Sequence, residues 1–444
     1  METIKYSGDN DKRINLVILS EGYQTMELDQ FILDATNFSN AMFSQSPFLE
    51  YSDYFNVYAI KVPSNESGAD HPANATDVSE PLFPAITVDT YFNATFDAFG
   101  YHRFLYYGID YTDAAIAEQK IISVLADNFP NYDQTLLLVN TTEYGGTGGQ
   151  FPIASVSSFE ISIHELGHSL FNLKDEYLLP DIFYAEAINM TQENDPDHIK
   201  WKNWLNINDV GIYPHSTTGV PSTWHRPHQN CKMRALDAPF CSVCKEGMVK
   251  KIHDLLSPID SFTPENTVNN PNFPLNFELT LIKPKPNTLM NEWTLNGTVI
   301  TNNVDAIEIL ENNLVDGINT LTVVITDESP LLKLDAHETV HINSVSWTIN
   351  YASLNIEEIT SNTQEYNISI YPNPLENIVN FKIESDAPFD LKAELTTLEG
   401  KRLGTVQLNN SNQTIDINYL KSGIYLVNFY SNKALITSKK IVKQ

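Results

Sequence analysis

The sequence predicts an α/β domain followed by two small all-β sandwich domains. Up to about residue 260, continuous apolar runs alternate with amphipathic helical patterns, which is typical of buried strands separated by helices. Beyond that point the helical patterns stop, and short apolar stretches are separated by turns rich in Pro and Asn. A chain of 444 residues is long enough for three domains, which we place at 1–260, 261–360 and 361–444.

The first domain reads as strands followed by helices. We expect buried strands at 14–19, 55–62 and 135–139, and helices at 28–42 and 112–129. A glycine-rich stretch, 144–151, follows the last of these strands. It predicts either a mobile loop or an exposed edge to which a peptide can add as a further strand.

Residues 164–168 read His-Glu-Leu-Gly-His and are the most informative stretch of the chain. On a helix, side chains four positions apart lie on the same face, so His164 and His168 can direct two imidazoles at one metal ion. Glu165 lies beside them, where a carboxylate can take a proton from a zinc-activated water and pass it to a leaving amine. The motif therefore predicts a zinc-dependent hydrolase.

The surrounding residues favour this interpretation over a chance match on an exposed helix. Residues 157–160 predict a capping box that begins the helix. Phe159, Ile163, Leu166 and Leu170 then follow at helical spacing as a buried stripe. Gly167 is costly inside an exposed helix, which indicates that another group approaches the backbone there.

A third metal ligand is expected shortly after the helix. Asn172 can adopt the left-handed conformation that ends a helix, which would fold the chain back toward the ion. Asp175 is the first choice for the ligand and Glu176 the alternative. Both carboxylates are also compatible with ordinary solvated charge.

Residues 164–177, with Cys-Lys-Met-Arg at 231–234 and Phe-Cys-Ser-Val-Cys at 240–244, resemble the IgA peptidase (igalysin) family of metzincin metallopeptidases. The resemblance extends roughly from residue 12 to residue 260. It implies a metzincin-like fold in which Met233 forms the Met-turn, an apolar floor beneath the metal. The usual metzincin pattern has a glycine three residues after the second histidine and the third ligand three residues further on. This chain has Phe171 and Lys174 at those positions. A shift of one residue, to Asn172 and Asp175, restores the pattern.

The segment 201–248 supplies further candidates. Three side chains could each donate a hydrogen bond to the oxygen of a carbonyl under attack. They are Tyr177, earlier in the chain, and Tyr213 and Arg234 within the segment. We expect His225 and His228 to make structural hydrogen bonds or substrate contacts rather than to bind a second metal ion.

All three cysteines, at 231, 241 and 244, lie in this same segment. Their proximity predicts a local disulfide from Cys231 to Cys241 or Cys244 in an oxidising compartment. The rivals are a redox Cys-x-x-Cys pair, which lacks a thioredoxin-like context, and a structural zinc site, which needs a fourth ligand such as His228.

The region after residue 260 predicts short strands of an immunoglobulin-type sandwich, whose expected role is spacing or substrate capture. These strands are placed at 277–281, 292–295, 306–310, 319–325 and 345–349. After residue 360, the motifs at 371–374, 398–400 and 420–426 and Lys439-Lys440 resemble the C-terminal sorting domain of the bacterial type IX secretion pathway. The resemblance implies the secretion machinery as a partner and export across the outer membrane of a Bacteroidota-like cell. Another small β-sandwich is the alternative.

Charge and hydropathy limit the partners. Before residue 361 the chain has 18 Lys and Arg against 48 Asp and Glu, which argues against nucleic acid and anionic membranes as partners. It contains no apolar run long enough for a membrane span. The first residues lack the apolar run of a signal peptide, so we expect the native precursor to begin further upstream.

Together these observations predict a secreted endopeptidase with one catalytic zinc ion, acting on proteins or glycoproteins. The resembled family takes its name from immunoglobulin A, but the resemblance does not make immunoglobulin A the expected substrate of this chain. The competing class is a surface binding or adhesion protein with an inert peptidase-like domain. The intact set of His164, Glu165 and His168 favours the enzyme.

Overall fold

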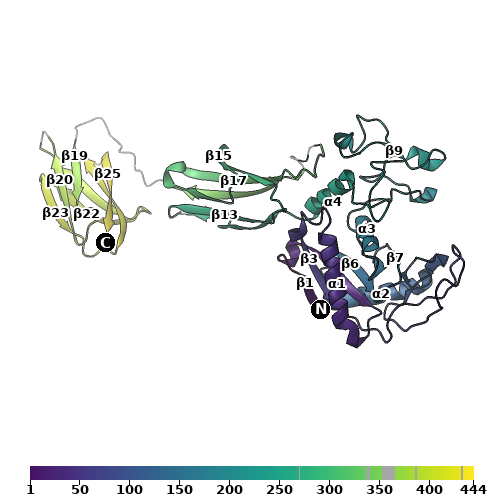
Figure 1. Cartoon of the computed structure of the whole chain (residues 1–444). Helices are drawn as coiled ribbons and strands as arrows, with labels where there is room; N and C mark the ends of the chain where they lie inside the picture. Colours follow the sequence, from purple (N-terminus) through teal and green to yellow (C-terminus); the bar gives the residue numbers. More distant parts are fainter. Residues whose placement is uncertain (270, 336, 338–340, 353–365, 386–387, 432–433) are drawn as a thin grey trace. The chain divides into compact units, whose positions relative to one another are not determined.

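The computed structural model describes residues 1–269, 271–335, 337, 341–352, 366–385, 388–431 and 434–444. The chain forms two compact units, Met1–Tyr351 and Ala352–Gln444 (Figure 1). The boundary expected between residues 360 and 361 lies outside the described residues.

A six-stranded sheet with the order β1-β3-β2-β6-β8-β7 forms the centre of the N-terminal part of unit 1. The four inner strands are parallel, and the edge strands β1 and β7 are antiparallel to their neighbours. The strands are β1 (Glu2–Lys5), β2 (Ile14–Glu21), β3 (Phe55–Ile60), β6 (Gln134–Val139), β7 (Gly146–Thr147) and β8 (Ile153–Ser155).

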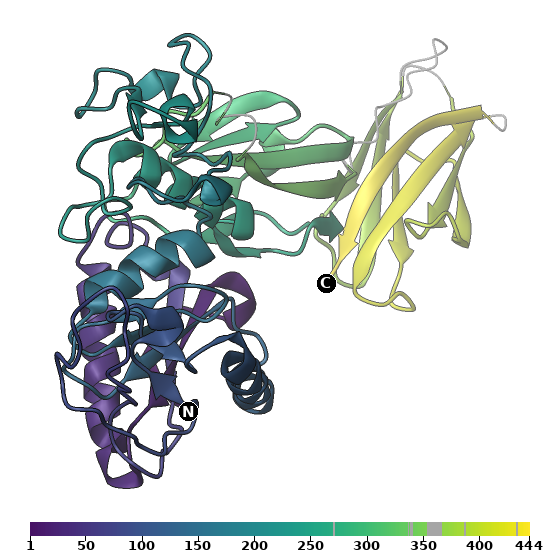
Figure 2. The ribbon, with the colours of Figure 1, turned by 90° about the vertical axis from the view of Figure 1, so that its right-hand side faces the viewer.

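Helices cover both faces of this sheet (Figure 2). They are α1 (Leu28–Phe43), α2 (Tyr111–Asn128), α3 (Phe159–Ser169) and α4 (Ser242–Leu255). Because side chains alternate along a strand, Leu16 and Ile18 of β2 pack in one core with α1, α3 and α4, whereas Val17 and Leu19 pack in the other with α2. The region is a mixed α/β structure, which confirms the predicted fold class for this part.

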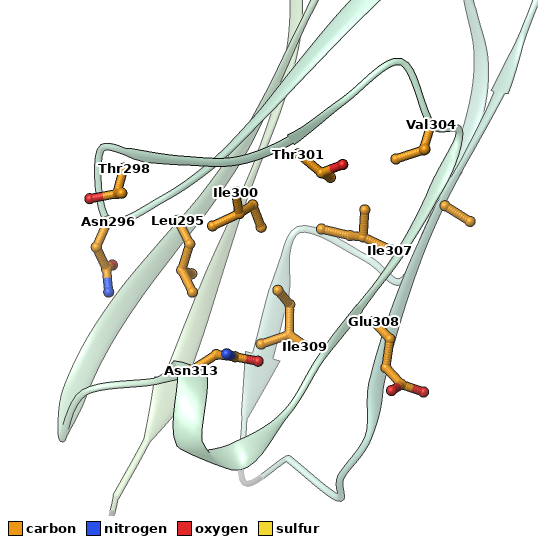
Figure 3. Close-up of a pocket in the computed structure, with 11 residues that line it drawn as sticks. Leu295, Asn296, Thr298, Ile300, Thr301, Val304, Ile307, Glu308, Ile309 and Asn313 are labelled. Carbon is orange, nitrogen blue, oxygen red and sulfur yellow. The ribbon is translucent and has the colours of Figure 1, made fainter.

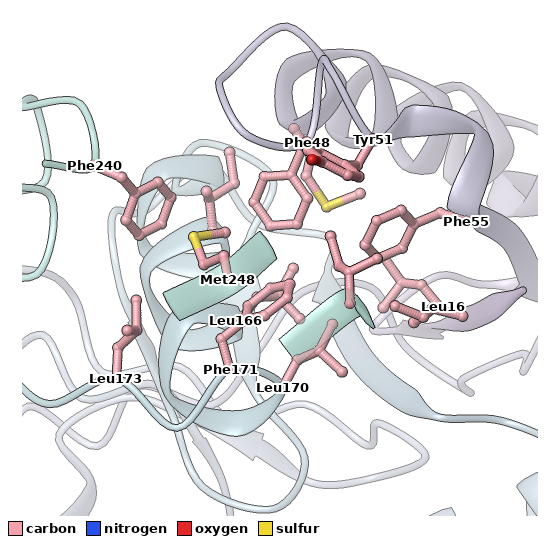
Figure 4. Packing of buried hydrophobic residues seen from close by; sticks show 14 of the residues in the cluster. Leu16, Phe48, Tyr51, Phe55, Leu166, Leu170, Phe171, Leu173, Phe240 and Met248 are labelled. Atoms are coloured by element: carbon pink, nitrogen blue, oxygen red, sulfur yellow. The ribbon is translucent and has the colours of Figure 1, made fainter. Parts of the chain in front are cut away.

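The helix α3 is held by its apolar stripe. Leu166 is 1% exposed and lies with Leu170 in the first core, where Phe55 and Met248 are neighbours in the same cluster (Figure 4). Full burial of such a side chain contributes about 1.5–3 kcal/mol. This packing sets which face of α3 is left to carry the two histidines.

The predicted capping box is wrong. Helix α3 begins after Ser158, whose side chain makes no cap hydrogen bond. The Ser157 hydroxyl donates instead to the Thr142 carbonyl, and the Glu160 carboxylate forms an ion pair with the buried Lys232. The side chains of Ser157 and Glu160 therefore contact residues distant in the sequence instead of capping the helix.

Short elements complete the α/β part. Two-residue strands pair as β4 (Ala94–Thr95) with β5 (Tyr106–Tyr107), and as β9 (Tyr213–Pro214) with β10 (His225–Arg226). Single turns of 3-10 helix lie at Asn10–Lys12, Thr25–Glu27, Ser52–Tyr54, Ala98–Gly100, Asp181–Phe183, Lys202–Trp204 and Val220–Thr223.

The C-terminal part of unit 1 is all-β, as expected. One sheet has the order β11-β13-β16 and the other β12-β18-β17-β14-β15. Trp293 and Trp347 stack at 5.6 Å between ring centroids in its buried core. Its elements are β11 (Ile259–Thr263), β12 (Thr267–Asn269), β13 (Leu275–Leu281), β14 (Leu289–Leu295), β15 (Thr298–Asn302), β16 (Ala306–Ile309), a 3-10 turn at Glu311–Asn313, β17 (Gly317–Asp327) and β18 (Asn343–Tyr351).

A cavity of about 670 Å³ opens between β15 and β16 (Figure 3). Its lining is largely aliphatic, with Ile300, Ile307 and Ile309, and includes one ionisable side chain, Glu308. This lining lacks the paired ionisable side chains of a catalytic site.

Unit 2 is also all-β, with sheets of order β19-β20-β23 and β22-β21-β24-β25. Phe381 and Phe429 meet edge to face in its core. The strands are β19 (Asn367–Tyr371), β20 (Ile378–Glu384), β21 (Leu391–Thr396), β22 (Arg402–Leu408), β23 (Asn412–Asp416), β24 (Gly423–Ser431) and β25 (Ala434–Lys443). Within the part of the chain that the structure describes, no helix has the length and apolarity needed to cross a membrane.

Candidate metal centre

The imidazoles of His164 and His168 converge from adjacent turns of α3. Their Nε2 atoms are 3.2 Å apart, and Asp175 Oδ1 lies 3.1 Å from the first and 3.0 Å from the second. The three residues form a group whose potential ligand atoms all lie within 4.8 Å of one another. The structure thus brings together the two histidines and the first-choice carboxylate expected from the sequence.

Backbone carbonyls fix the orientation of both rings. His164 Nδ1 donates to the Lys232 carbonyl at 3.0 Å, and His168 Nδ1 donates to the Leu173 carbonyl at 2.7 Å. A proton on Nδ1 leaves the Nε2 lone pair free for a metal ion, which is the arrangement seen around metal-binding histidines.

The end of α3 places Asp175. Asn172 has a φ of 57°, in the left-handed region, and its amide bonds to the His168 carbonyl at 3.0 Å. This turn folds the chain back so that the carboxylate faces the histidines. Burial acts to raise the pKa of Asp175, but hydrogen bonds from His164 and His168 outweigh it and hold the pKa below its ordinary value.

Glu176 does not face the histidines, which corrects its place as the alternative ligand. Its Oε1 accepts hydrogen bonds from Asn189 Nδ2 at 3.0 Å and from Cys244 Sγ at 3.1 Å. The physical reason is that the fixed backbone after Asn172 directs the two adjacent carboxylates to different places. Burial raises the pKa of Glu176 well above its ordinary value.

Glu165 lies between the histidines and the sheet edge. A Cβ built on Gly148, the residue after β7, would come within 2.1 Å of Glu165 Oε2, so this carboxylate lies against a backbone that has no room for a side chain. Burial raises the pKa of Glu165, while the nearby His164 and His168 act to lower it. Glu165 is half-buried.

Met233 packs against the helix α3 at Gly167. It is fully buried, and a Cβ on Gly167 would lie 2.8 Å from its Sδ. This contact explains why the helix has a glycine at that position, as the sequence indicated.

The three candidate oxyanion donors differ in position. The pKa of Tyr177 is raised by burial and then by the neighbouring Asp175, so this phenol belongs to the surroundings of the histidine cluster. The Tyr213 hydroxyl donates to the Asp209 carbonyl at 3.3 Å, and Arg234 donates to the Gln229 carbonyl. Of the three, Tyr177 is the one that interacts with a residue of the histidine cluster.

The expected disulfide is not formed in this structure. Cys231, Cys241 and Cys244 are free and buried, and the Sγ atoms of Cys231 and Cys244 are 3.6 Å apart, compared with about 2.05 Å in a disulfide. His228 does not belong to the group that they form among the described residues, and its Nδ1 accepts a hydrogen bond from the Asn230 amide. The fourth group is Glu176.

A further cluster escaped sequence reasoning entirely. His71, Glu80, Asp97 and His102 meet with potential ligand atoms within 4.8 Å of one another. Their spacings in the sequence match no metal-binding pattern, and they lie in a stretch with little regular structure. No local signal marks them.

A His-Glu-x-x-His helix on an α/β sheet, with a carboxylate folded back onto both imidazoles, defines the class of metallopeptidases. Residues 3–220 match the family described as IgA Peptidase M64, so the chain contains a peptidase domain of that family. The match includes the histidine cluster and Glu176 but ends before Cys231. Residues 369–444 match the secretion system C-terminal sorting domain, which indicates export through the type IX secretion pathway.

Other comparisons add little. No curated protein matches the chain. Dimeric latent PorU from Porphyromonas gingivalis is 10% identical, with a TM-score of 0.17, and the match covers 41% of this chain and 19% of that chain. The β-glucuronidase of Parabacteroides merdae is 9% identical, with a TM-score of 0.15, and the match covers 50% of this chain and 28% of that chain. The fibronectin(III)-like modules of Clostridium thermocellum CbhA are 11% identical, with a TM-score of 0.15, and the match covers 41% of this chain and 95% of that chain. Such low TM-scores establish no common fold.

Proposed function

We propose that this metallopeptidase is a zinc-dependent endopeptidase that hydrolyses extracellular proteins after export. The observation that supports this most directly is the convergence of His164, His168 and Asp175 on one point, with Glu165 beside them. The substrate class follows from the secretion-system domain rather than from the site.

The donor set fits a single zinc ion. Two imidazole nitrogens and one carboxylate oxygen are a set of catalytic zinc ligands. Their bonds of about 2.0–2.2 Å place the ligand atoms of a tetrahedron about 3.3–3.6 Å apart. The separations of 3.0–3.2 Å between these atoms are close to that. A zinc ion bound there supplies a Lewis acid and lowers the pKa of a coordinated water to about 7.

Glu165 acts as general base and then as general acid. It accepts a proton from the attacking water as the water oxygen adds to the amide carbon. It then delivers that proton to the amide nitrogen as the C–N bond breaks. Burial raises the pKa of Glu165, which suits a group that must both take up and release a proton near neutral pH.

The edge strand β7 provides a place for an extended substrate. It is the last strand of the sheet, but its Gly146 amide already donates to the Arg103 carbonyl, so an added peptide would pair from Thr147 onward. A peptide that adds antiparallel to β7 would pass Gly148 and therefore Glu165. Tyr177, which interacts with Asp175, is our proposed donor to the carbonyl oxygen during attack.

The other regions have supporting roles. We propose that residues 261–360 form an immunoglobulin-like sandwich for spacing or substrate capture, and that 361–444 engage the secretion machinery. The metzincin-like character of residues 1–260 is supported by the buried Met233 under Gly167.

The test compares the wild type with Glu165→Gln on denatured casein and on immunoglobulin. Loss of a general base lowers activity by about 10²–10⁴-fold, whereas zinc content should be unchanged because Glu165 is not a ligand. Equal activity of the two proteins would reject this mechanism. Absence of activity in both would favour the second candidate, a surface binding protein with an inert peptidase-like domain.

A further inference from the structure

The four buried residues Glu176, Cys231, Cys241 and Cys244 form a second group with the composition of a metal site. Their potential ligand atoms lie within 4.8 Å of one another, and all four residues are buried. They come from three places: the chain after α3, the Met233 turn, and the start of α4.

The sulfur geometry fits a metal ion better than a disulfide. Zinc–sulfur bonds of about 2.3 Å place two sulfurs of a tetrahedron about 3.8 Å apart. The Sγ atoms of Cys231 and Cys244 are 3.6 Å apart, and Cys244 Sγ lies 3.1 Å from Glu176 Oε1. The separation of the two sulfurs is near this edge length, whereas the contact between Cys244 Sγ and Glu176 Oε1 is a hydrogen bond that a bound ion would replace.

The carboxylate gives an independent indication. Glu176 is fully buried, and its Oε2 has no hydrogen-bond partner among the described residues. An unpartnered carboxylate oxygen away from water is strongly unfavourable. A cation among the three sulfurs removes this cost, and Asn189 Nδ2 at 3.0 Å from Oε1 orients the carboxylate from outside.

We propose that Glu176, Cys231, Cys241 and Cys244 bind a structural zinc ion. Soft thiolate ligands select zinc over calcium or magnesium, and four protein ligands leave no open position for catalysis. The ion would tie together two segments that build the histidine cluster. Glu176 follows Asp175, and Cys231 precedes Lys232, whose carbonyl orients His164. This proposed zinc site does not depend on the proposed peptidase function.

Cobalt substitution tests this site separately from the histidine cluster. The full chain with His164→Ala and His168→Ala should, when loaded with Co²⁺, show a thiolate-to-cobalt charge-transfer band, because only the cysteine site supplies sulfur. Adding Cys244→Ser should remove or strongly shift the band. Because that variant can fail to fold, Glu176→Gln is measured as well, and it should keep the band but bind Co²⁺ more weakly.

Two results would overturn the proposal. One is the absence of a thiolate band in the folded protein with all three cysteines. The other is fewer than three alkylatable thiols per chain after unfolding in chelator without reductant, which would show a disulfide instead.

A different observation supports a second site in the long stretch between β3 and α2. His71, Glu80, Asp97 and His102 meet there, with side chains only 1%, 9%, 0% and 12% exposed. Four of their facing atoms have no hydrogen-bond partner among the described residues: His71 Nε2, Glu80 Oε1, Asp97 Oδ1 and His102 Nδ1. Such convergence of unpartnered buried polar atoms points to a missing cation.

The distances match nitrogen and oxygen ligands of one ion. His71 Nε2 is 3.4 Å from Asp97 Oδ2, and His102 Nδ1 is 3.4 Å from Asp97 Oδ1 and 3.2 Å from Glu80 Oε1. Bonds of about 2.0–2.2 Å give tetrahedral edges of about 3.3–3.6 Å.

Neighbouring groups hold the two rings as they do around known metal-binding histidines. Glu143 Oε2 lies 3.2 Å from His71 Nδ1, so that nitrogen carries a proton and leaves Nε2 for a metal ion. Phe83 stacks on His102 with an interplanar angle of 8°. We infer that these four residues bind a second structural zinc ion, since two imidazoles favour zinc over the all-oxygen shell of calcium.

Metal analysis of variants tests this second site. His71→Ala with His102→Ala should lower bound zinc by one equivalent per chain relative to the wild type, and chelation of the wild type should expose residues 62–110 to limited proteolysis. The matched control is His198→Ala, a histidine with a 72% exposed side chain. Equal zinc content in the double variant and the control, or proteolysis of 62–110 that ignores chelation, would overturn the inference.

Discussion

The adjacent carboxylates of Asp175 and Glu176 lie in two different clusters. Asp175 Oδ1 is 3.0 Å from His168 Nε2, whereas Glu176 Oε1 is 3.1 Å from Cys244 Sγ. The Glu176 amide also donates to the Met233 carbonyl at 2.7 Å. One short segment therefore joins the candidate catalytic centre, the cysteine cluster and the turn that contains Met233.

Asp175→Asn should weaken zinc binding at the histidine cluster and abolish peptidase activity. The substitution keeps the shape of the side chain but removes the charge that faces both imidazoles. We expect a loss of affinity larger than the roughly 10–100-fold that follows from losing an outer-shell partner. Zinc titration against a competing chelator measures it. Asp181→Asn, an exposed position in the same segment, is the control, and wild-type affinity in Asp175→Asn would remove Asp175 from the ligand set.

Tyr177→Phe should lower kcat by roughly 10²-fold, the usual cost of removing one oxyanion donor, with little change in KM. The phenol lies near Asp175, and the substitution removes only its hydroxyl. Tyr213→Phe serves as the matched control because its hydroxyl bonds locally to Asp209. Steady-state kinetics on a peptide substrate separates the two. A drop for Tyr213→Phe, with Tyr177→Phe unaffected, would reverse the assignment.

Gly148→Ala should impair catalysis while leaving zinc in place. The new Cβ would meet Glu165 Oε2 at 2.1 Å, so the carboxylate must move. Displacement of a catalytic group by about 1 Å can cost 10²-fold in rate. The control is Gln150→Ala, an exposed residue in the same stretch. The rate and the zinc content of each variant are measured together. Wild-type values of both in Gly148→Ala would contradict the placement of Glu165.

The sequence predicted those parts of the site that depend on local geometry. Helical spacing aligned His164 with His168, and Asn172 indicated the turn that returns Asp175. Likewise, the glycine at 167 indicated a close neighbour, which is Met233.

What could not be predicted depends on residues brought together by the tertiary fold. Counting cysteines favoured a disulfide because the fourth member of their cluster, Glu176, comes from 55 residues before the first of them. Equally, nothing in the sequence near His71 indicates that Asp97 and His102 return to it. The failed capping box has the same origin, since Lys232 pairs with Glu160 from a distant segment.

Asp327→Asn should destabilise unit 1 at neutral pH by about 1.5–3 kcal/mol, the range for a hydrogen bond to a charged group. Asp327 Oδ2 accepts from Tyr51 at 2.6 Å and from His253 at 2.9 Å, which joins β17 to the α/β part. Burial acts to raise the pKa of Asp327, but hydrogen bonds, first from His253 and then from Thr288 and Tyr51, lower it below the ordinary value.

The sign of the pH dependence follows from this shift. Because the folded-state pKa lies below that of the unfolded chain, about 3.9, the ionised Asp327 stabilises the fold above that pH, and the contribution is lost as pH falls through the folded pKa. The difference between wild type and Asp327→Asn should therefore be full at pH 7 and shrink in acid below about pH 4. Denaturation at both pH values measures it, with the exposed neighbour Glu328→Gln as control. A pH-independent difference would show that packing, not charge, makes Asp327 stabilising.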